Sequence, residues 1–398
     1  MTAPSSRNVG QAGLHVRYEK AGLILDALPI PWNADAVIVE ANVRLPTGTP
    51  PAKHDFTLRL STDVAPIAAE ILGQQSKNAP VRVFFRIPVP LQSCSVQVYW
   101  REHSLGNVEL PIVAQATFED GFALEMPTVH VMLGGRTVAC RAFVTTQAKN
   151  LLVSAVVRSA VPLAAALNMG LRVEIHRANG QSVASAVVPF TSEQLRTRQT
   201  LVSVQMPKLR TIGTYEVSWY LADRCLNKQR IRTVSKKTLL RSLRISATRF
   251  HVTMDDGTNQ TVRSLPTRDG QLLLDGIAQV APIFFVCSGE AGMAGLVPFT
   301  LRALIGDLVS TAGSEKDVLV TDGPTPIILG VLSAAALSQA KHFTLIAGET
   351  SLGNLPLLPA PTADFTGEGG FAALDDYLWS SAAEEQLNER LGKLLDGG

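Results

Sequence analysis

Apolar and polar residues alternate in short runs along most of the chain, a pattern that predicts β-strands with one buried face. Within the first 120 residues, prolines and other turn residues separate these runs. Because proline cannot donate a hydrogen bond to a β-ladder, the prolines mark edges and connections. The spacing is typical of an antiparallel sandwich, with predicted strands at Leu23–Leu25, Ala36–Val39, Phe56–Leu60, Val81–Phe85 and Val96–Trp100.

The middle of the chain contains the clearest hairpin. Residues Leu171–His176 alternate strictly, and Ser182–Val188 form the returning strand after the pair Asn179-Gly180. An Asn-Gly pair predicts a two-residue type I′ turn, in which both central residues have positive φ. Further on, Gly213–Trp219 places its aromatic side chains on one face, and Tyr215 near its start resembles the tyrosine corner of Greek-key sandwiches.

One short sequence occurs three times, each time directly after a predicted strand. Glu102–Asn107 reads Glu-His-Ser-Leu-Gly-Asn, Glu349–Asn354 reads Glu-Thr-Ser-Leu-Gly-Asn, and Asp223–Lys228 is a degraded copy. Repetition at a fixed period indicates tandem structural units. The equivalent leucines, 121 and 126 residues apart, are Leu105, Leu226 and Leu352.

These patterns predict an all-β chain of three tandem immunoglobulin-like or fibronectin-like β-sandwich modules. Module one covers residues 12–118, module two residues 121–235 and module three residues 240–361. Modules one and three are the most alike, because Phe56–Arg59 and Phe299–Arg302 share the sequence Phe-Thr-Leu-Arg.

The last segment, residues 362–398, differs from the modules. A glycine-rich spacer, Asp364–Gly370, precedes leucines at helical spacing, and Ser381–Glu384 has the form of a capping box. We expect an acidic linker and an amphipathic C-terminal helix, which either docks into a protein partner or packs on module three of the same chain. The predicted partner-binding residues are Phe371, Leu374, Asp375, Asp376, Tyr377, Leu378, Trp379, Leu387, Leu391 and Leu394.

The charge is distributed unevenly although the net charge is only +2. Lys and Arg outnumber Asp and Glu by 14 to 5 in module two, whereas the acids outnumber the bases by 8 to 2 in residues 362–398. Such separation points to an electrostatic partner: nucleic acid, an acidic protein segment, or this chain's own tail in self-association. A solvated strand edge is the alternative. The predicted basic patch consists of Lys228, Arg230, Arg232, Lys236, Lys237, Arg241 and Arg244.

Composition and cysteine usage set the expected location. The chain has 398 residues, 46% of them hydrophobic, so it can bury several cores. The N-terminal residues 1–13 lack the apolar core of a signal peptide, and the longest apolar run, Ile327–Ala336, is too short to span a bilayer. Four scattered cysteines favour free thiols over a Cys140–Cys225 bridge. We therefore expect a cytoplasmic protein without a membrane segment.

Candidate catalytic and metal-binding residues are few. The glycine-rich stretch Cys287–Gly295 matches no nucleophile, phosphate or dinucleotide motif and predicts an inter-strand loop. Asp255–Asn259 predicts a hairpin turn, because Arg263 stands where a calcium loop needs Glu. The seven histidines are scattered singly, so we expect no metal, no cofactor and no enzymatic activity.

The sequence therefore predicts a non-enzymatic scaffold or adaptor that binds protein partners through its modules and its C-terminal helix. Two alternatives stay open. One is a nucleic-acid-binding protein that uses module two and residues 228–249. The other is a structural component of a large assembly.

Overall fold

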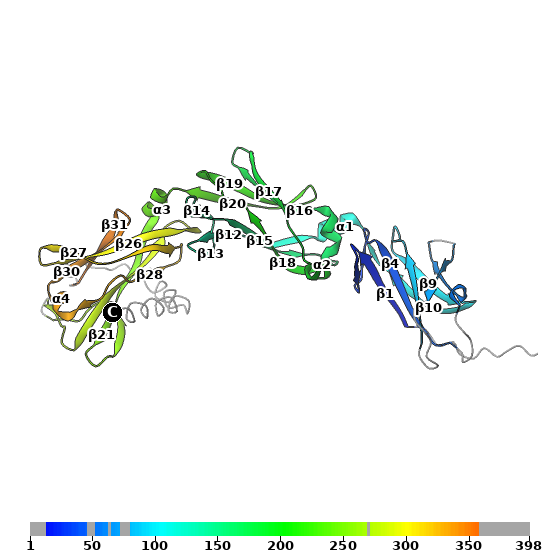
Figure 1. Ribbon diagram of the computed structural model, residues 1–398, viewed down its shortest axis with the longest axis horizontal. Helices are drawn as coiled ribbons and strands as arrows, with labels where there is room; N and C mark the ends of the chain where they lie inside the picture. The colour runs from blue at the N-terminus through cyan, green and yellow to red at the C-terminus, as the bar shows by residue number, and fades with distance from the viewer. Residues whose placement is uncertain (1–12, 46–51, 63–64, 72–79, 269–270, 358–398) are drawn as a thin grey trace, which may run out of the picture.

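The computed structural model describes residues 13–45, 52–62, 65–71, 80–268 and 271–357. Strands dominate these residues, so the chain is all-β, as the alternation predicts. Three groups of strands follow one another along the longest axis of the molecule (Figure 1), and each surrounds a hydrophobic core. We keep the module names for these groups and assign the two helices at the predicted boundaries to the core in which their buried residues lie. Helix α1 (Gln115–Gly121) therefore belongs to module two and α3 (Lys236–Ser242) to module three, although the predicted boundaries divide them differently.

Module one consists of two facing sheets with the strand orders β2-β1-β4-β8-β7 and β10-β9-β5-β6, and a parallel pair of β3 with β11. Strand β8 shows why the sheets face each other, because Val83 and Phe85 are buried while Arg82 and Arg86 are exposed. Its elements are β1 (Gly13–Lys20), β2 (Leu23–Leu25), β3 (Ile30–Pro31), β4 (Ala36–Val43), η1 (Lys53–Asp55), β5 (Phe56–Leu60), β6 (Ile67–Ala68), β7 (Glu70–Ile71), β8 (Val81–Ile87), β9 (Cys94–Trp100), β10 (His103–Leu110) and β11 (Ile112–Val113).

Module two has one sheet of order β13-β12-β15-β18 and contributes β17-β16-β19-β20-β14 to a second, larger sheet. Tyr215 confirms the predicted tyrosine corner, because its hydroxyl donates to the Thr211 carbonyl at 2.8 Å. Its elements are α1 (Gln115–Gly121), β12 (Ala123–Leu133), β13 (Arg136–Ala139), β14 (Ala142–Val144), β15 (Leu151–Arg158), η2 (Leu163–Met169), β16 (Leu171–Arg177), β17 (Ser182–Val187), α2 (Ser192–Arg196), β18 (Gln199–Met206), β19 (Gly213–Leu221) and β20 (Arg224–Val234).

Module three pairs β22-β21-β25-β28, with β29 also on β25, and faces them with β26, β27, β30 and β31. The predicted turn at Asp255–Asn259 joins β21 to β22, and residues 289–292 join β25 to β26. Its elements are α3 (Lys236–Ser242), β21 (Leu243–Met254), β22 (Asn259–Val262), β23 (Thr267–Arg268), β24 (Gln271–Leu272), β25 (Ile277–Ser288), β26 (Met293–Ile305), β27 (Leu308–Val320), β28 (Thr325–Ile327), β29 (Leu332–Ser333), α4 (Ala334–Ser338), β30 (Ala340–Ala347) and β31 (Thr350–Pro356).

The repeated sequence forms the same hairpin in all three modules. The hairpins β9/β10, β19/β20 and β30/β31 each close with a two-residue turn whose first residue has a φ of 50–61°. Two residues further along, the strand register shifts by one residue, so a β-bulge follows each turn. The extra residue is always the repeated leucine, and each packs on its own module's core: Leu105, Leu226 and Leu352.

The predicted turn type of the β16/β17 hairpin is wrong. Only Gly180 has positive φ, at 83°, and the Arg177 N–H donates to the Gln181 carbonyl at 2.9 Å. The loop therefore has three residues, with glycine alone in the left-handed position. Asn179 is not needed for positive φ, and its side-chain oxygen instead accepts from the Gln181 N–H at 3.1 Å.

Strand β14 joins modules two and three into one sheet. Its residues pair in parallel with β20 on one side and with β26 on the other, which produces a nine-stranded sheet. The Ala142 N–H donates to the Gly292 carbonyl at 2.9 Å, and the Arg232 N–H donates to the Arg141 carbonyl at 2.7 Å. The hydrophobic cores of modules two and three also share residues here, because Val144 of β14 lies in the core of module three. We call this shared region the seam.

Gln147 extends the seam by one more pair of hydrogen bonds. Its Nε2 donates to the Leu296 carbonyl at 2.7 Å, and its Oε1 accepts from the Leu296 N–H at 2.8 Å. The side-chain amide thus takes the place of a peptide group beside β26. Close packing explains the glycine that precedes Leu296, because a Cβ at Gly295 would lie 2.4 Å from a Leu239 methyl group.

Modules one and two are joined by side chains rather than by a sheet. Trp32 packs against Phe118 of α1 with ring centroids 5.3 Å apart. The Asn33 Nδ2 donates to the Ala165 carbonyl at 2.9 Å. Leu195 of α2 is buried in the core of module one, so this core also takes residues from beyond the predicted boundary.

Candidate binding surface

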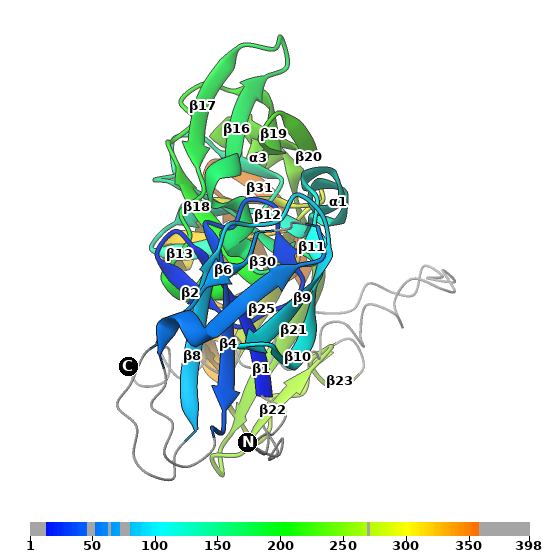
Figure 2. The ribbon, with the colours of Figure 1, turned by 90° about the vertical axis from the view of Figure 1, so that its right-hand side faces the viewer.

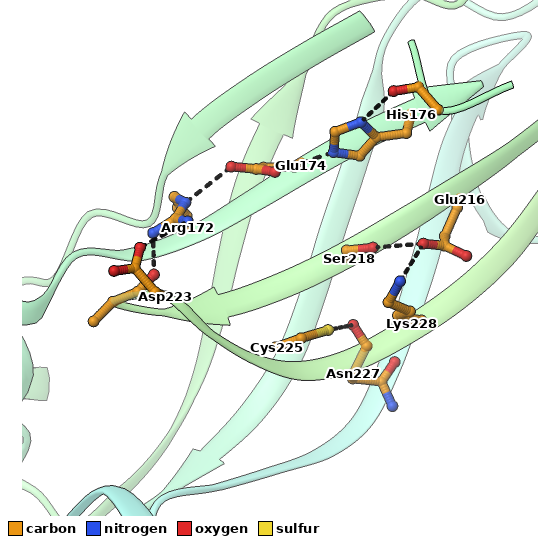
Figure 3. Close-up of polar contacts among 11 residues, drawn as sticks. Arg172, Glu174, His176, Glu216, Ser218, Asp223, Cys225, Asn227 and Lys228 are labelled. Carbon is orange, nitrogen blue, oxygen red and sulfur yellow. Dashed lines mark hydrogen bonds and ion pairs between the residues drawn. The ribbon is translucent and has the colours of Figure 1, made fainter. Parts of the chain in front are cut away.

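The solvent-facing side of the β16, β19 and β20 strands carries a set of paired charges (Figure 3). Alternation along β16 buries Val173 and Ile175 and turns Arg172, Glu174 and His176 outward. The neighbouring strands add Glu216 from β19 and Lys228 from β20, while Ser218 of β19 lies fully buried beside Glu216. We call Arg172, Glu174, His176, Glu216 and Lys228 the charged face.

Arg172 and His176 both contact Glu174 along β16. The Arg172 Nε donates to Glu174 Oε1 at 2.9 Å, and the His176 Nε2 lies 3.0 Å from Glu174 Oε2. The Arg172 guanidinium also lies over the Tyr220 ring, 4.9 Å from its centroid. The hydrogen bonds from Arg172 and then His176 lower the pKa of Glu174, so this carboxylate stays ionised at neutral pH.

Glu216 is the acceptor of a second group on the adjacent strands. Lys228 Nζ donates to Glu216 Oε1 at 2.9 Å, and Ser218 Oγ donates to the same oxygen at 3.3 Å. The hydrogen bond from Lys228 lowers the pKa of Glu216, and the same bond raises the pKa of Lys228. The charged face therefore presents alternating signs in fixed positions, which suits recognition of a protein surface of mixed charge.

The predicted basic patch divides into paired and unpaired cations. Lys228 pairs with Glu216, and Arg232 pairs with Glu290 across the seam. Among the described residues, no ion pair involves the other five, which are exposed: Arg230 on β20, Lys236, Lys237 and Arg241 on α3, and Arg244 on β21. Helix α3 lies at the junction of modules two and three (Figure 1).

Two of the unpaired cations lie where a positive charge does not stabilise their helix. Lys236 and Lys237 are in the first turn of α3, where the helix dipole disfavours positive charge, and this turn contains no acidic residue. Ser235 caps the helix by accepting from the Thr238 N–H at 3.0 Å. The positions of these lysines are therefore not explained by helix stability.

The predicted partner-binding residues of the tail, Phe371 to Leu394, lie outside the described residues. Of the charged face, only Lys228 was predicted as a site residue, as part of the basic patch, although β16 itself was predicted. The signal was present, because Arg172, Glu174 and His176 occupy the polar positions of a strictly alternating strand. Their partners Glu216 and Lys228 come from strands distant in sequence, and only the register brings them together.

The cysteines are unpaired, and burial keeps two of them protonated. All four cysteines are free thiols, including Cys140 and Cys225. Burial raises the pKa of Cys287, and it raises that of Cys140 to about 12, so both thiols are protonated at neutral pH. In the part of the chain that the structure describes, no group of three His, Cys, Asp or Glu side chains could hold a metal ion.

No helix of the described ranges combines the length and apolar character that a bilayer crossing requires. No protein-family model and no curated protein matches the chain.

Among solved structures, the chain is similar to S-layer protein SbsC domains 4 and 5, with a TM-score of 0.28, 11% identity, and coverage of 57% of this chain and all of that one. It is also similar to FdeC, an adhesin of Escherichia coli (TM-score 0.25, 10% identity, 88% of this chain and 97% of that one). Invasin, a bacterial integrin-binding protein, matches with a TM-score of 0.25 and 12% identity over 88% of this chain and 60% of that one.

These comparisons contradict the predicted cytoplasmic location, because the matched structures are surface-layer proteins, adhesins and an integrin-binding protein. Sparse cysteines and the composition of residues 1–13 were insufficient grounds for that prediction. Free thiols describe the chemistry of the four side chains and do not identify a compartment.

Proposed function

We propose that this chain is a non-enzymatic structural protein that binds a protein partner and holds its binding surfaces in a fixed arrangement. The observation that carries this proposal is the seam, where β14 belongs to one sheet together with strands of both modules two and three. Shared backbone hydrogen bonds resist hinge motion far better than a flexible linker does. A protein with this construction keeps the charged face and the surface of module three at constant spacing.

The charged face is the proposed contact for a folded protein partner. Its acids and bases already neutralise each other, so it has little attraction for a polyanion but can exchange its ion pairs with a complementary surface. The tail segment 362–398 is a second proposed contact, with Leu378 and Trp379 as apolar anchors.

Affinity capture with purified full-length chain tests this function. We compare the wild type with Arg172→Glu/Lys228→Glu on the charged face and with Leu378→Asp/Trp379→Ala in the tail. The proposal predicts that one and the same protein is captured by the wild type and lost with either double variant. The variant Arg136→Glu, an exposed arginine on β13, is the control for altered net charge. Identical captured proteins from all four chains would contradict the proposal.

Polyanion binding is a second candidate function, and the five unpaired cations near the seam favour it. Nucleic acid and the acidic segment 362–398 of another copy are both possible polyanions. Binding of a DNA duplex and of a 362–398 peptide is measured as a function of salt for the wild type and for Lys236→Glu/Lys237→Glu. Loss of two phosphate contacts should reduce the salt slope for duplex DNA by about 2.

The matched control for that experiment is Lys208→Glu/Arg210→Glu, which reverses two exposed cations elsewhere in module two. Equal effects of the two double variants would mean that only net charge matters, and would remove a specific polyanion site. Binding of the peptide but not of DNA would leave self-association as the surviving form of this candidate.

A further inference from the structure

Strand β17 is an open edge of the nine-stranded sheet. It pairs with β16 on one side, and within the described ranges no strand pairs with its other side. Figure 2 shows β17 at the outer margin of module two, projecting from the body of the molecule. An open edge presents a row of backbone N–H and C=O groups to which another strand can add.

The composition of β17 does nothing to block such addition. The strand contains no charged residue and no proline, and Val183 and Val187 are 39% and 67% exposed. Strand β27, another edge of the same sheet, has two register shifts and exposes Lys316 and Asp317. Bulges and charges of this kind discourage edge pairing. In the ladder between β17 and β16, Val183 is one extra residue on β17, and the register is regular from Ala184 to Val187.

The sequence of this edge is a palindrome. Residues 183–187 read Val-Ala-Ser-Ala-Val, which is the same in both directions. Two copies that pair antiparallel with Ser185 opposite Ser185 therefore place Val183 beside Val187 and Ala184 beside Ala186. The twofold axis makes these contacts reciprocal, as in any isologous interface, and the palindrome makes each contact a pair of like side chains.

The hydrogen-bonding direction of the strand agrees with this register. The Val188 N–H donates to the Leu171 carbonyl of the β16 side at 2.8 Å. In an antiparallel ladder the bonding direction alternates, so Ala184 and Ala186 face β16 while Ser185 and Val187 direct their backbone groups to the open side. Ser185 can thus donate to, and accept from, Ser185 of a second copy.

We propose that a second copy of this chain docks on β17 by antiparallel pairing centred on Ser185, so that the two nine-stranded sheets become continuous. This inference goes beyond the proposed function, because it needs neither the charged face nor the tail. Glu174 lies opposite Ser185 on β16, so in this register both β17 strands separate the two Glu174 side chains, at about 14 Å for three strand spacings. That distance exceeds the screening length at physiological salt, which is about 8 Å. The pairing is short, so the dimer is weak and depends on concentration.

Sedimentation velocity of the full-length chain, from about 1 to about 100 µM, tests the proposal. The wild type should shift towards a dimer as the concentration rises. Ser185→Lys and Ser185→Glu should each remain monomeric, because residue 185 faces itself across the axis and the charges repel. An equimolar mixture of these two variants should regain the dimer. Ser310→Lys, at an exposed serine on β27, another edge of the same sheet, is the matched control and should behave as the wild type.

A cysteine crosslink reports the register independently. Ser185→Cys, in a Cys225→Ser background that removes the exposed native thiol, should form an intermolecular disulfide under mild oxidation. Ala184→Cys should not, because its partner in this register is Ala186. A wild type that stays monomeric throughout, or a dimer that survives Ser185→Lys, would overturn the proposal. Failure of the mixture to regain the dimer would do the same.

Discussion

Replacement of Gln147 by alanine tests the seam at a single side chain. Gln147 donates to the Leu296 carbonyl and accepts from the Leu296 N–H, at 2.7 and 2.8 Å. Alanine removes both hydrogen bonds without disturbing the pairing of β14 with β20 or β26, because those bonds join backbone atoms of other residues. The effect should therefore be local to the contact between modules two and three.

The expected magnitude follows from the two lost bonds. Each contributes about 1 kcal/mol net, so the variant should lower the free energy of opening at the seam by about 2 kcal/mol. Leu296 is only half-buried, so water can partly solvate its backbone groups and the larger penalty of a buried unsatisfied pair does not apply. A loss of 2 kcal/mol corresponds to about 30-fold faster hydrogen exchange when exchange is limited by opening.

Native-state hydrogen exchange read by mass spectrometry measures this change. Peptides that contain residues 142–148 and 293–297 should exchange faster in Gln147→Ala than in the wild type, while peptides of module one should not change. Gln205→Ala, at an exposed glutamine on β18, serves as the control. An acceleration of less than about twofold at both seam segments would refute the assignment of a structural role to this amide.

Three further substitutions test the core of module one, the tyrosine corner and the charged face. Leu105→Ala removes the buried bulge leucine of module one and should cost about 2–5 kcal/mol in urea unfolding, whereas Leu91→Ala, fully exposed, should cost less than about 0.5 kcal/mol. Equal costs would mean that the repeat leucine is not part of the core. Tyr215→Phe removes the hydrogen bond to Thr211 and should lower stability by about 1 kcal/mol, with no change in the far-UV spectrum. Glu174 has a lowered pKa in the folded state, so its stabilising contribution is present above its unfolded-state pKa and is lost as the pH falls through the folded value. Glu174→Gln should therefore lower the midpoint of thermal unfolding at pH 7 and approach the wild type as the pH falls through the folded-state pKa of Glu174; a difference that is unchanged in acid would contradict the ion-pair assignment.

The strands and the repeat could be predicted because their signals are local. The alternation of apolar and polar residues predicted a strand with the same first and last residues as β5, Phe56–Leu60. The buried side chains of this strand, Phe56 and Leu58, are two residues apart, as alternation requires. The shared sequence around Leu105 and Leu352 predicted equivalent hairpins, and the reason is now physical: a turn with positive φ and a bulge that turns the leucine inward.

The seam could not be predicted, because the strands that form it are far apart in the sequence and β14 is short. β14 has three residues, too few to show a period, and its parallel partner β26 begins about 150 residues later. The same reason explains the charged face, where Glu216 and Lys228 meet the β16 residues only through strand register. The type I′ turn at Asn179-Gly180 was wrong because a dipeptide does not fix the loop length.

We expect modules two and three to form one rigid unit through the seam. Pulsed electron paramagnetic resonance tests this rigidity directly, by the distance between spin labels at Thr137 of β13 and Ser310 of β27, which are both exposed. Cys225 and Cys287 are first replaced by serine so that they are not labelled. A rigid unit should give one narrow distance distribution that does not change with salt. A broad distribution, as flexibly linked modules produce, would contradict it.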